Sequence, residues 1–446
     1  MNNLSSIESN QPICSFLHLG DIHLGYRQYK LMEREKDFYR SLRDICRVGA
    51  IEKKVDFVLI AGDLFNVRAI SPQTYNEAVF VFSELKKTGI PVIAIEGNHD
   101  FKETGNFSSL RGSWFEALAQ NELIYFLYPE YKDSEIALKP LIFNQKFLGG
   151  GYLDLPIGSK TIRIIGSKWQ GFNAGKSLEM FAESIKQIPS PPADFSVFMF
   201  HAGGEDYLPV SRGGVSNADF QCLNGVVDYV ALGHIHEHYV IKNEAGQDFI
   251  FNPGSTEANS MAEIDIKRGG LLVSVNSEKK INYELLTNYK QRKFIKLPDF
   301  KANKFPTQLH LNEFILERTK SELLLANELL SNLEDNKPIV QINIIGQADF
   351  VRSNEELNNL KQSIEEVGAL YCQVKWDLET QVIVTDQKIN IQDCRYEIER
   401  QILEGIIGND SSIDASEEFA ELMIRTKDSI LKGVEDRELL EALEQH

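Results

Sequence analysis

The sequence predicts an α/β fold in which helices cover the faces of a β-sheet, followed by two smaller units. Over the first 290 residues, short apolar runs alternate with segments whose apolar residues recur at helical spacing. Polar motifs rich in aspartate and histidine follow five of the apolar runs. Alternating strands and helices favour a largely parallel sheet, and polar motifs at strand ends are typical of a site at its edge.

Six of the apolar runs are short and bounded by turn-forming residues, so we expect them to be buried strands. They comprise residues 13–19, 55–61, 91–95, 162–165, 195–200 and 229–232. Helical spacing is found in residues 32–48, 72–87 and 178–187. Later runs at residues 249–252, 270–275 and 281–286 have no helical segment between them, so we expect antiparallel pairing there.

A second unit begins near Arg292 and has the pattern of a small α+β domain. Residues 311–333 and 354–367 have helical spacing, whereas residues 338–345 and 369–378 resemble strands. A unit of about 90 residues falls within the usual range of domain sizes. We therefore expect three parts, with bounds at residues 1–290, 291–386 and 387–446.

The third part, residues 387–446, is helical throughout in pattern. Two apolar stripes are separated by a break at residues 409–412, and Ser416 is a plausible helix cap. Two amphipathic helices cannot form a core by themselves, so they must dock on another surface. That surface is either this chain's own second unit or a partner protein, and the sequence leaves both open.

The composition is that of an ordinary globular protein, with 43% hydrophobic and 25% charged residues among 446. No apolar stretch is long enough to span a bilayer, and residues 1–11 lack the features of a signal peptide. Five scattered cysteines argue against both a disulfide framework and a thiolate zinc site. We therefore expect a cytoplasmic protein without membrane association.

Five motifs carry metal-binding side chains at the points where expected strands end, and they hold five of the nine histidines. In four motifs a glycine precedes the first polar residue, and glycine permits a strained turn that directs the next side chain. Strand C-termini of an open α/β sheet face the ligand crevice, so these side chains can converge. The motifs are Gly20-Asp21-Ile22-His23, Gly62-Asp63-Leu64-Phe65-Asn66, Gly97-Asn98-His99-Asp100, Phe200-His201-Ala202 and Gly233-His234-Ile235-His236.

Each motif alone has an ordinary structural explanation, because Gly-Asp after a strand is often only a turn. Together they indicate a metal centre, since carboxylate, imidazole and carboxamide suit manganese, iron or zinc rather than calcium. Seven candidates exceed the needs of one tetrahedral ion and fit two ions bridged by a carboxylate, for which Asp63 is the natural candidate. The candidate ligands are Asp21, His23, Asp63, Asn98, His201, His234 and His236.

In this order the motifs resemble the signature of the calcineurin-like metallophosphoesterase superfamily, over most of residues 13–260. The resemblance implies a β-sandwich flanked by helices, two divalent metal ions with manganese as the expected ion, and phosphoester hydrolysis. It implies that His99 is a catalytic residue rather than a ligand, oriented by Asp100. By the same resemblance, one ion would be held by Asp21, His23, Asp63 and His236, and the other by Asp63, Asn98, His201 and His234.

Finer features resemble DNA repair nucleases of the SbcD type, notably residues 17–26, Asp63-Leu64-Phe65 and Asn252-Pro253-Gly254-Ser255-Thr256-Glu257. This resemblance implies a nuclease acting on DNA ends and a capping domain after Arg292. It also implies docking of the C-terminal helices on an SMC-like coiled-coil ATPase of the SbcC type.

The same resemblance implies a homodimer formed through helices of the phosphoesterase domain. Residues 72–87 and 114–119 are apolar enough to take part, with Val79, Val81 and Phe82 as candidates for a shared bundle. Burial within the monomer explains that pattern equally well.

One departure from the family pattern lies three residues after Asp63, where archaeal and eukaryotic members usually carry histidine and this chain has Asn66. In the family that histidine bears on exonuclease positioning, so endonuclease activity is better supported here. We expect Asn66 to hydrogen-bond a phosphate of the substrate. Basic residues near the expected mouth are candidates for holding the DNA backbone, namely Arg27, Arg68, Lys102 and Arg111.

The formal net charge of −18 is unusual for a protein that handles DNA, which generally presents a basic face. Residues 388–446 contribute 15 acidic and 7 basic residues to this balance. Bound cations would also neutralise the acidic ligands. We therefore expect a partner to supply part of the grip on DNA.

Two alternative functions remain open at this level. A phosphatase or small-molecule phosphodiesterase could use the same ligands, because one scaffold hosts many chemistries. A non-cutting scaffold that binds DNA ends is the other, although a scaffold has no chemical need for a complete dinuclear site. Activity on an aryl phosphodiester without activity on DNA would favour the first, and near-zero metal content would favour the second.

Overall fold

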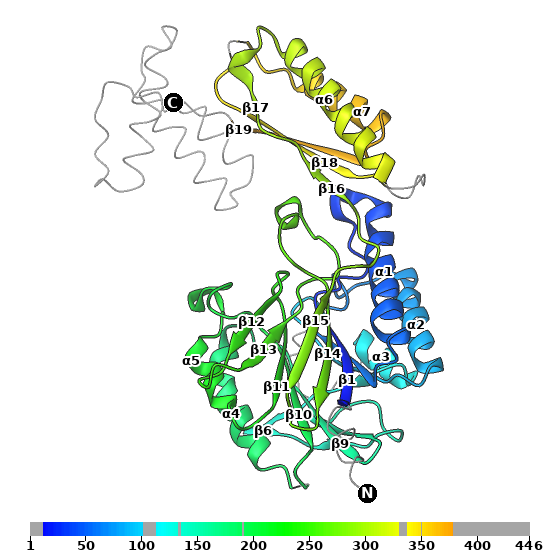
Figure 1. Ribbon diagram of the computed structural model, residues 1–446, viewed down its shortest axis with the longest axis vertical. Helices are drawn as coiled ribbons and strands as arrows, with labels where there is room; N and C mark the ends of the chain where they lie inside the picture. Colours follow the sequence, from blue (N-terminus) through cyan, green and yellow to red (C-terminus); the bar gives the residue numbers. More distant parts are fainter. Residues whose placement is uncertain are drawn as a thin grey trace, which may run out of the picture. The chain divides into compact units, whose positions relative to one another are not determined.

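The computed structural model describes residues 12–100, 113–132, 135–189, 191–329, 337–348 and 350–377 (Figure 1). The chain divides into two compact units. The first comprises Met1–Lys296, Leu323–Gln341 and Val367–Tyr371, and the second comprises Leu297–Glu322, Ile342–Glu366 and Cys372–His446. The expected part at residues 387–446 lies outside the described residues, and the bounds placed after residues 290 and 386 stay predictions.

The first unit contains two β-sheets that pack face to face (Figure 1). One sheet has, in spatial order, β15 (Ile281–Leu286), β14 (Gly270–Asn276), β1 (Pro12–Leu19), β2 (Phe57–Ala61), β3 (Val92–Ile95) and β4 (Tyr125–Phe126). The other has β12 (Tyr239–Lys242), β13 (Asp248–Asn252), β11 (Tyr229–Gly233), β10 (Phe195–His201), β9 (Lys160–Gly166), β8 (Tyr152–Ile157) and β7 (Pro140–Leu141). A separate pair is formed by β5 (Glu130–Lys132) and β6 (Glu135–Ala137).

The central strands are apolar on both faces because each face packs against a different layer. In β2, Phe57 and Leu59 point into the core between the two sheets, whereas Val58 and Ile60 point toward the helices. Successive side chains of a strand alternate between faces, so an unbroken apolar run is what a doubly covered strand requires. β10 follows the same rule, with Val197 and Met199 facing the first sheet and Phe198 and Phe200 facing the helices.

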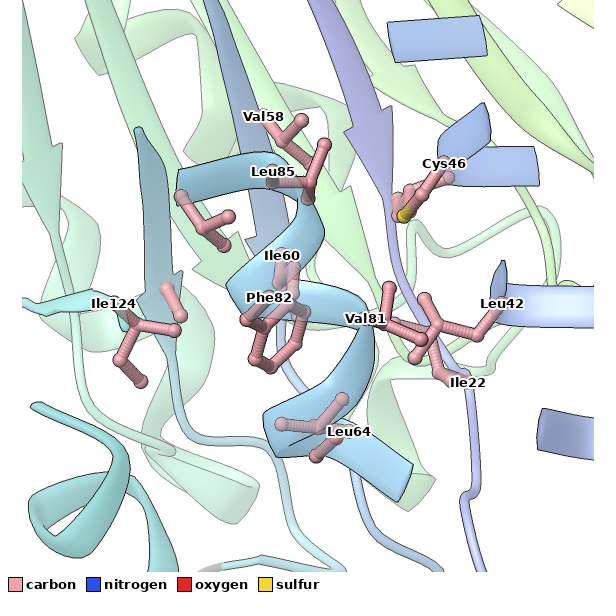
Figure 2. Packing of buried hydrophobic residues seen from close by; sticks show 14 of the residues in the cluster. Ile22, Leu42, Cys46, Val58, Ile60, Leu64, Val81, Phe82, Leu85 and Ile124 are labelled. Carbon is pink, nitrogen blue, oxygen red and sulfur yellow. The ribbon is translucent and has the colours of Figure 1, made fainter. Parts of the chain in front are cut away.

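Helices cover the outer face of each sheet. The first sheet is covered by α1 (Met32–Cys46), α2 (Pro72–Lys87) and α3 (Trp114–Gln120), and the second by α4 (Ala174–Lys186) and α5 (Asn217–Phe220). Figure 2 shows Val81, Phe82 and Leu85 of α2 among the side chains of β2. Short helical turns occupy Gln28–Lys30, Arg47–Ile51, Gly171–Asn173, Val210–Arg212, Gln221–Leu223, Met261–Glu263 and Ala302–Lys304.

The α/β class and the implied β-sandwich flanked by helices are confirmed, but two details differ from the expectation. The polar motifs come from two sheets rather than from one. Residues 249–252 were expected to be antiparallel to their neighbours, yet β13 runs parallel to β11, with Val230 opposite Ile250. The unpredicted strand β12 accounts for this, because it reverses the chain between β11 and β13 and takes the antiparallel pairing itself.

The candidates for a shared dimer bundle, Val81 and Phe82, are buried in the core of the unit itself, and Val79 packs partly against that core. Their apolar character therefore reflects the contact between α2 and the first sheet. Phe80 points the other way and is 51% exposed. The burial of Val81 and Phe82 favours packing within the monomer, one of the two explanations that the sequence leaves open. Phe80 differs from them because adjacent residues on a helix face different directions.

Two segments after the sandwich form a second set of elements. Within the first unit, β16 (Phe294–Lys296) pairs in parallel with the beginning of β18 (Ile339–Ile345). Within the second unit, β17 (Phe300–Lys301) pairs in parallel with the end of β18, and β19 (Tyr371–Asp377) also pairs with β18. Two helices accompany these strands, α6 (Gln308–Leu329) and α7 (Asn354–Glu366). The side-chain amide of Gln308 donates a hydrogen bond to the backbone carbonyl of Ser353 and accepts one from its N–H.

Among the described helices, none combines the length and the apolar character that crossing a membrane would require. The cysteines in the described residues, Cys14, Cys46, Cys222 and Cys372, all carry free thiols. Cys394 lies outside the described residues.

We expect Phe82→Ala to lower the free energy of unfolding of the first unit by about 3–5 kcal/mol, because it removes a fully buried ring and leaves a cavity. Ile142→Ala is the control, since that side chain is 53% exposed and its loss should change stability by less than about 0.5 kcal/mol. Urea unfolding followed by circular dichroism measures both. Equal midpoints for the two variants would contradict the placement of α2.

Candidate metal centre

The five polar motifs lie at the C-terminal ends of five strands drawn from both sheets. Asp21, Asp63 and Asn98 follow β1, β2 and β3, which run parallel to one another. His201 ends β10, and His234 directly follows the parallel strand β11. The site therefore forms where matching edges of the two sheets meet.

Hydrogen bonds that involve the backbone connect the sheets at this edge. Nδ1 of His201 lies 2.7 Å from the carbonyl oxygen of Ala61, at the end of β2. The backbone N–H of His234 donates to both carboxylate oxygens of Asp21, at 3.0 and 2.8 Å. These bonds hold a histidine from the second sheet against a loop of the first and fix the relative positions of the ligand candidates.

Backbone strain is concentrated on the candidate ligands themselves. Asp21, His23, Asp63 and His234 have φ values of 51°, 54°, 51° and 91°, which side-chain-bearing residues rarely adopt. Such a conformation costs of order 1–3 kcal/mol and persists only where surrounding structure determines it. Here hydrogen bonds from the backbone N–H groups of Ile22 and His23 to the carbonyl oxygen of Asp63 tie the first two ligand loops together.

The glycines that precede the ligands serve mainly by lacking a side chain. A Cβ on Gly97 would lie 2.2 Å from Oδ1 of Asp63, and one on Gly233 would lie 2.3 Å from the carbonyl oxygen of Ala61. Only Gly62 of the four also has a positive φ, at 92°. The expectation that these glycines provide the strained turn is therefore corrected, because close approach rather than strain requires glycine at the other three.

One half of the site contains Asp21, His23 and His236, whose ligand atoms all lie within 4.8 Å of one another. The Nε2 atoms of His23 and His236 are 3.1 Å apart. Both nitrogens and the Asp21 carboxylate thus point toward a common position. This grouping brings together three of the four residues expected to hold the first ion.

The other half is organised around the Asn98 side chain. Its Oδ1 lies 3.1 Å from Nε2 of His201 and 2.9 Å from Nδ1 of His234. Oδ2 of Asp63 lies 3.4 Å from the same Nε2 of His201. Asp63, Asp21 and His201 form a further group with ligand atoms within 4.8 Å, so Asp63 adjoins both halves.

Burial and neighbouring charges shift the pKa values of these groups. Burial raises the pKa of Asp21 to about 6, although neighbouring imidazoles oppose the shift. Burial lowers the pKa values of His23 and His234 to about 3. Burial also opposes protonation of His201, but the carboxylates of Asp63 and Asp21 outweigh it and raise its pKa to about 9. A cation bound at this histidine would displace its proton.

The donor set fits a pair of divalent cations. The carboxylates of Asp21 and Asp63 are buried together, which is unfavourable for two like charges unless cations compensate them. Nδ1 of His23 is buried without a hydrogen-bond partner among the described residues. The opposite nitrogen of this ring, Nε2, lies 3.1 Å from Nε2 of His236 and faces the converging donors, so Nε2 is the candidate ligand atom.

His99 lies beside these groups and is exposed. Its ring forms an edge contact with that of His23, with centroids 4.8 Å apart, and its backbone N–H donates to Oδ1 of Asp63. Nδ1 of His99 lies 2.6 Å from the carbonyl oxygen of Asn66. That acceptor favours a proton on Nδ1, which leaves Nε2 as the nitrogen available to a substrate.

Asp100 was expected to orient the His99 ring, and the structure gives it different contacts. Its carboxylate accepts hydrogen bonds from the backbone N–H groups of Leu64, Phe65 and Gly97, at 3.2, 2.9 and 3.0 Å. Asp100 therefore ties the loop after β2 to the loop after β3. The short Asp side chain accepts hydrogen bonds from loop N–H groups that have no partner strand, and the sequence motif does not reveal this role.

Two of the predicted DNA contacts, Arg27 and Arg68, lie on the loops that follow β1 and β2. Arg27 is exposed, and its guanidinium forms an ion pair with Glu35. Arg68 is exposed, and its carbonyl oxygen accepts a hydrogen bond from the Trp114 indole. Asn66 is partly exposed, and its described hydrogen bonds are made by its backbone. Lys102 and Arg111 lie outside the described residues.

Glu263 is a site residue that the sequence analysis missed. Its Oε1 lies 3.0 Å from Nδ1 of His236, and its Oε2 accepts a hydrogen bond from the backbone N–H of Asn259. Burial opposes protonation of His236, but the hydrogen bond to Glu263 helps raise its pKa. A carboxylate on the second nitrogen of a ligand histidine fixes its tautomer and orientation. Glu263 has no motif around it, so only the fold identifies it.

The segment that resembles SbcD proteins after β13 ends in a buried ion network. Glu257 accepts hydrogen bonds from the Ser41 hydroxyl and the backbone N–H of Arg292, and its carboxylate lies 3.4 Å from the Arg34 guanidinium. Asp37 binds both Arg34 and Arg292, at 2.7 and 2.6 Å. This network holds the loop against α1, and the loop supports the site because Ser255 N–H donates to the carbonyl of His236.

Known proteins resemble the chain over this same region. A family model described as "Calcineurin-like phosphoesterase" matches residues 14–238. A protein named "DNA double-strand break repair protein Mre11" from Methanococcus maripaludis is 27% identical over 383 residues, covering 81% of this chain and 91% of that protein. Proteins of the same name from Archaeoglobus fulgidus and Methanosarcina mazei are 29% and 38% identical. The matches cover 56% and 55% of this chain, but only 51% and 34% of those proteins.

We expect Glu263→Gln to weaken the affinity for Mn²⁺ roughly 10- to 100-fold, because the amide holds the His236 ring less firmly. Isothermal titration calorimetry on the full chain measures this affinity directly. Glu244→Gln is the control, since Glu244 is exposed and has no role in the site. An unchanged affinity in the Glu263 variant would show that this carboxylate does not position the ring.

Proposed function

The chain belongs to the calcineurin-like phosphoesterase family, and from this premise we propose that it is a DNA nuclease of the SbcD type. The proposed reaction is hydrolysis of phosphodiester bonds with two divalent ions, manganese being the expected metal. The observation that carries the proposal is the convergence of seven ligand candidates on one edge of the sandwich, with His99 beside them. The repair function in the relatives' printed name supports DNA as the substrate.

In this proposal, Asp21, His23 and His236 hold one ion, and Asn98, His201 and His234 hold the other. Asp63 would be shared by the two sets, which its group with Asp21 of the first set and His201 of the second supports. Bound cations would supply Lewis acidity toward the phosphate and would activate a water molecule. The donor types favour manganese, iron or zinc over calcium.

The roles of this chain's own residues follow from their contacts. His99 keeps Nδ1 on the Asn66 carbonyl and uses Nε2 to stabilise charge on the phosphate and to protonate the leaving oxygen. Asp100 is a positioning residue, because it fixes the two loops that carry Asp63 and Asn98. Asn66 and Arg68 would contact the DNA backbone at the rim. Arg27 would do the same after exchanging its contact with Glu35 for a phosphate.

The unit that follows Arg292 is proposed to act as a capping domain that shapes access to DNA. Residues 387–446, for which the sequence predicts helices, are proposed to dock on an SMC-like ATPase of the SbcC type. The net charge of −18 supports a partner, because an acidic chain by itself grips DNA weakly. Cleavage that is unchanged by added ATPase subunit, over a range of salt concentrations, would count against that partner.

We expect His99→Ala to lower the rate of Mn²⁺-dependent cleavage of single- and double-stranded DNA by roughly 10²- to 10⁴-fold, as the loss of a general acid does. Metal content should stay at the wild-type level, because His99 is not among the proposed ligands. His310→Ala, an exposed histidine on α6, is the control and should cut at the wild-type rate. The cleavage assay resolves exonuclease from endonuclease products on a labelled oligonucleotide.

Equal cutting by wild type and the His99 variant would remove this residue from the mechanism. Absence of DNA cleavage together with hydrolysis of an aryl phosphodiester would instead indicate a phosphatase or small-molecule phosphodiesterase. Absence of both activities in a protein without bound metal would favour a scaffold that binds DNA ends.

The chain is also proposed to form a homodimer through the outer face of α1 and α2. The rings of Tyr39 and Phe80 lie side by side there, with centroids 6.5 Å apart, and Phe80 is exposed. We expect Phe80→Glu to shift the sedimentation coefficient from that of a dimer to that of a monomer. A wild-type protein that sediments as a monomer at micromolar concentration would refute the dimer.

A further inference from the structure

A tryptophan lies directly against the metal centre without being able to bind a metal. Trp169 belongs to the loop between β9 and α4, and its ring centroid is 5.2 Å from that of His234 and 5.7 Å from that of His201. The indole nitrogen carries a hydrogen and offers no lone pair for coordination. Its place beside two ligand candidates therefore has to be explained by something other than metal binding.

The surroundings of Trp169 open toward solvent. Trp169 is partly exposed, whereas His201 is 1% exposed. Three residues further along the same loop, Phe172 is 79% exposed. Gly171 separates the two rings with a positive φ of 56°, which turns the chain between them. A partly exposed ring that contacts the ligand candidates, with a second exposed ring on the same loop, leaves aromatic surface available to a bound molecule.

The chemistry of the loop favours a nucleobase as that partner. The loop from Ser167 to Asn173 has two aromatic rings, one lysine and no acidic residue. Aromatic rings hold single-stranded nucleic acids by stacking on their bases, because every base presents a π-face. A nucleoside is bonded to the phosphate, so a phosphate at the metal centre brings a base within reach of Trp169.

From this arrangement we infer that Trp169, with Phe172 on the same loop, forms a stacking platform for an unpaired nucleobase next to the scissile phosphate. The inference rests on the proposed function and deepens it by naming the preferred form of DNA. Inside a duplex both faces of a base are covered by its neighbours, so stacking on Trp169 requires a single strand or a frayed end. The platform therefore directs the enzyme to unpaired DNA.

The experiment compares two oligonucleotides of equal length and charge, oligothymidylate and its abasic counterpart, with Ca²⁺ as the added cation. Trp169 is one of three tryptophans, so its fluorescence is followed in a Trp114→Phe, Trp376→Phe background. We expect oligothymidylate to quench this fluorescence and the abasic strand to leave it unchanged. The Trp169 variants lack this fluorophore, so their affinities are measured by the anisotropy of a dye-labelled strand. Trp169→Ala should weaken oligothymidylate binding by roughly 5- to 100-fold, whereas Trp169→Phe should retain most of the affinity.

Matched variants separate stacking from indirect effects. Phe172→Ala should weaken oligothymidylate binding less than Trp169→Ala, and Ile142→Ala, another exposed apolar residue, should have no effect. Calorimetric titration with Mn²⁺ checks that Trp169→Ala still binds metal as the wild type does. An equal loss of affinity for both strands in Trp169→Ala would overturn the platform, because a damaged site rather than a lost base contact would then explain it.

The outcomes also distinguish this inference from the proposed function. A wild-type protein that neither binds nor cuts any DNA would refute the nuclease, and the platform with it. A wild-type protein that cuts DNA but binds oligothymidylate and the abasic strand equally would refute the platform alone. Retained nuclease activity in Trp169→Ala, with loss of affinity for oligothymidylate but not for the abasic strand, supports both.

Discussion

The structure depends on holding two buried carboxylates and several imidazoles close together where two sheets end. Asp21 and Asp63 are both buried, and the groups around them repel one another or lack partners when no cation is present. Backbone hydrogen bonds between the ligand loops stabilise this arrangement. The left-handed backbone conformations of Asp21, His23 and Asp63 persist because hydrogen bonds between their loops hold the backbone in place.

The layers behind the site make that rigidity possible. Each central strand is covered on both faces, so the ends of β1, β2, β10 and β11 are fixed by a packed core before any ligand is considered. His18 shows the same principle inside the sandwich, since its ring nitrogens lie 3.0 Å from the Tyr229 hydroxyl and 2.9 Å from the Leu232 carbonyl oxygen. Both ring nitrogens of His18 have hydrogen-bond partners, so this histidine joins the two sheets. The histidines at the sheet edge keep a ring nitrogen available to a cation.

Supporting residues act through contacts that the sequence motifs do not reveal. Glu263 holds His236, Asp100 joins two ligand loops, and Glu257 anchors the loop after β13 through Arg34. Breaking a buried ion pair by removing one partner commonly costs about 3–5 kcal/mol, so the Arg34 network constrains the site from a distance. Trp169 also contacts the ligand candidates His201 and His234 from a loop that no sequence motif marks, so only the fold identifies it.

The sequence by itself determined the fold class, the order of the main strands and helices, and the seven side chains that meet at the site. These were readable because strand periodicity, helical spacing and motif position are local properties of the chain. The tertiary structure alone decided how the strands divide between two sheets, that β13 runs parallel to β11, and that Val81 and Phe82 face the core. It also decided the partners of Asp100 and Glu263, because a hydrogen bond between residues distant in sequence depends on how loops are brought together and leaves no periodic trace.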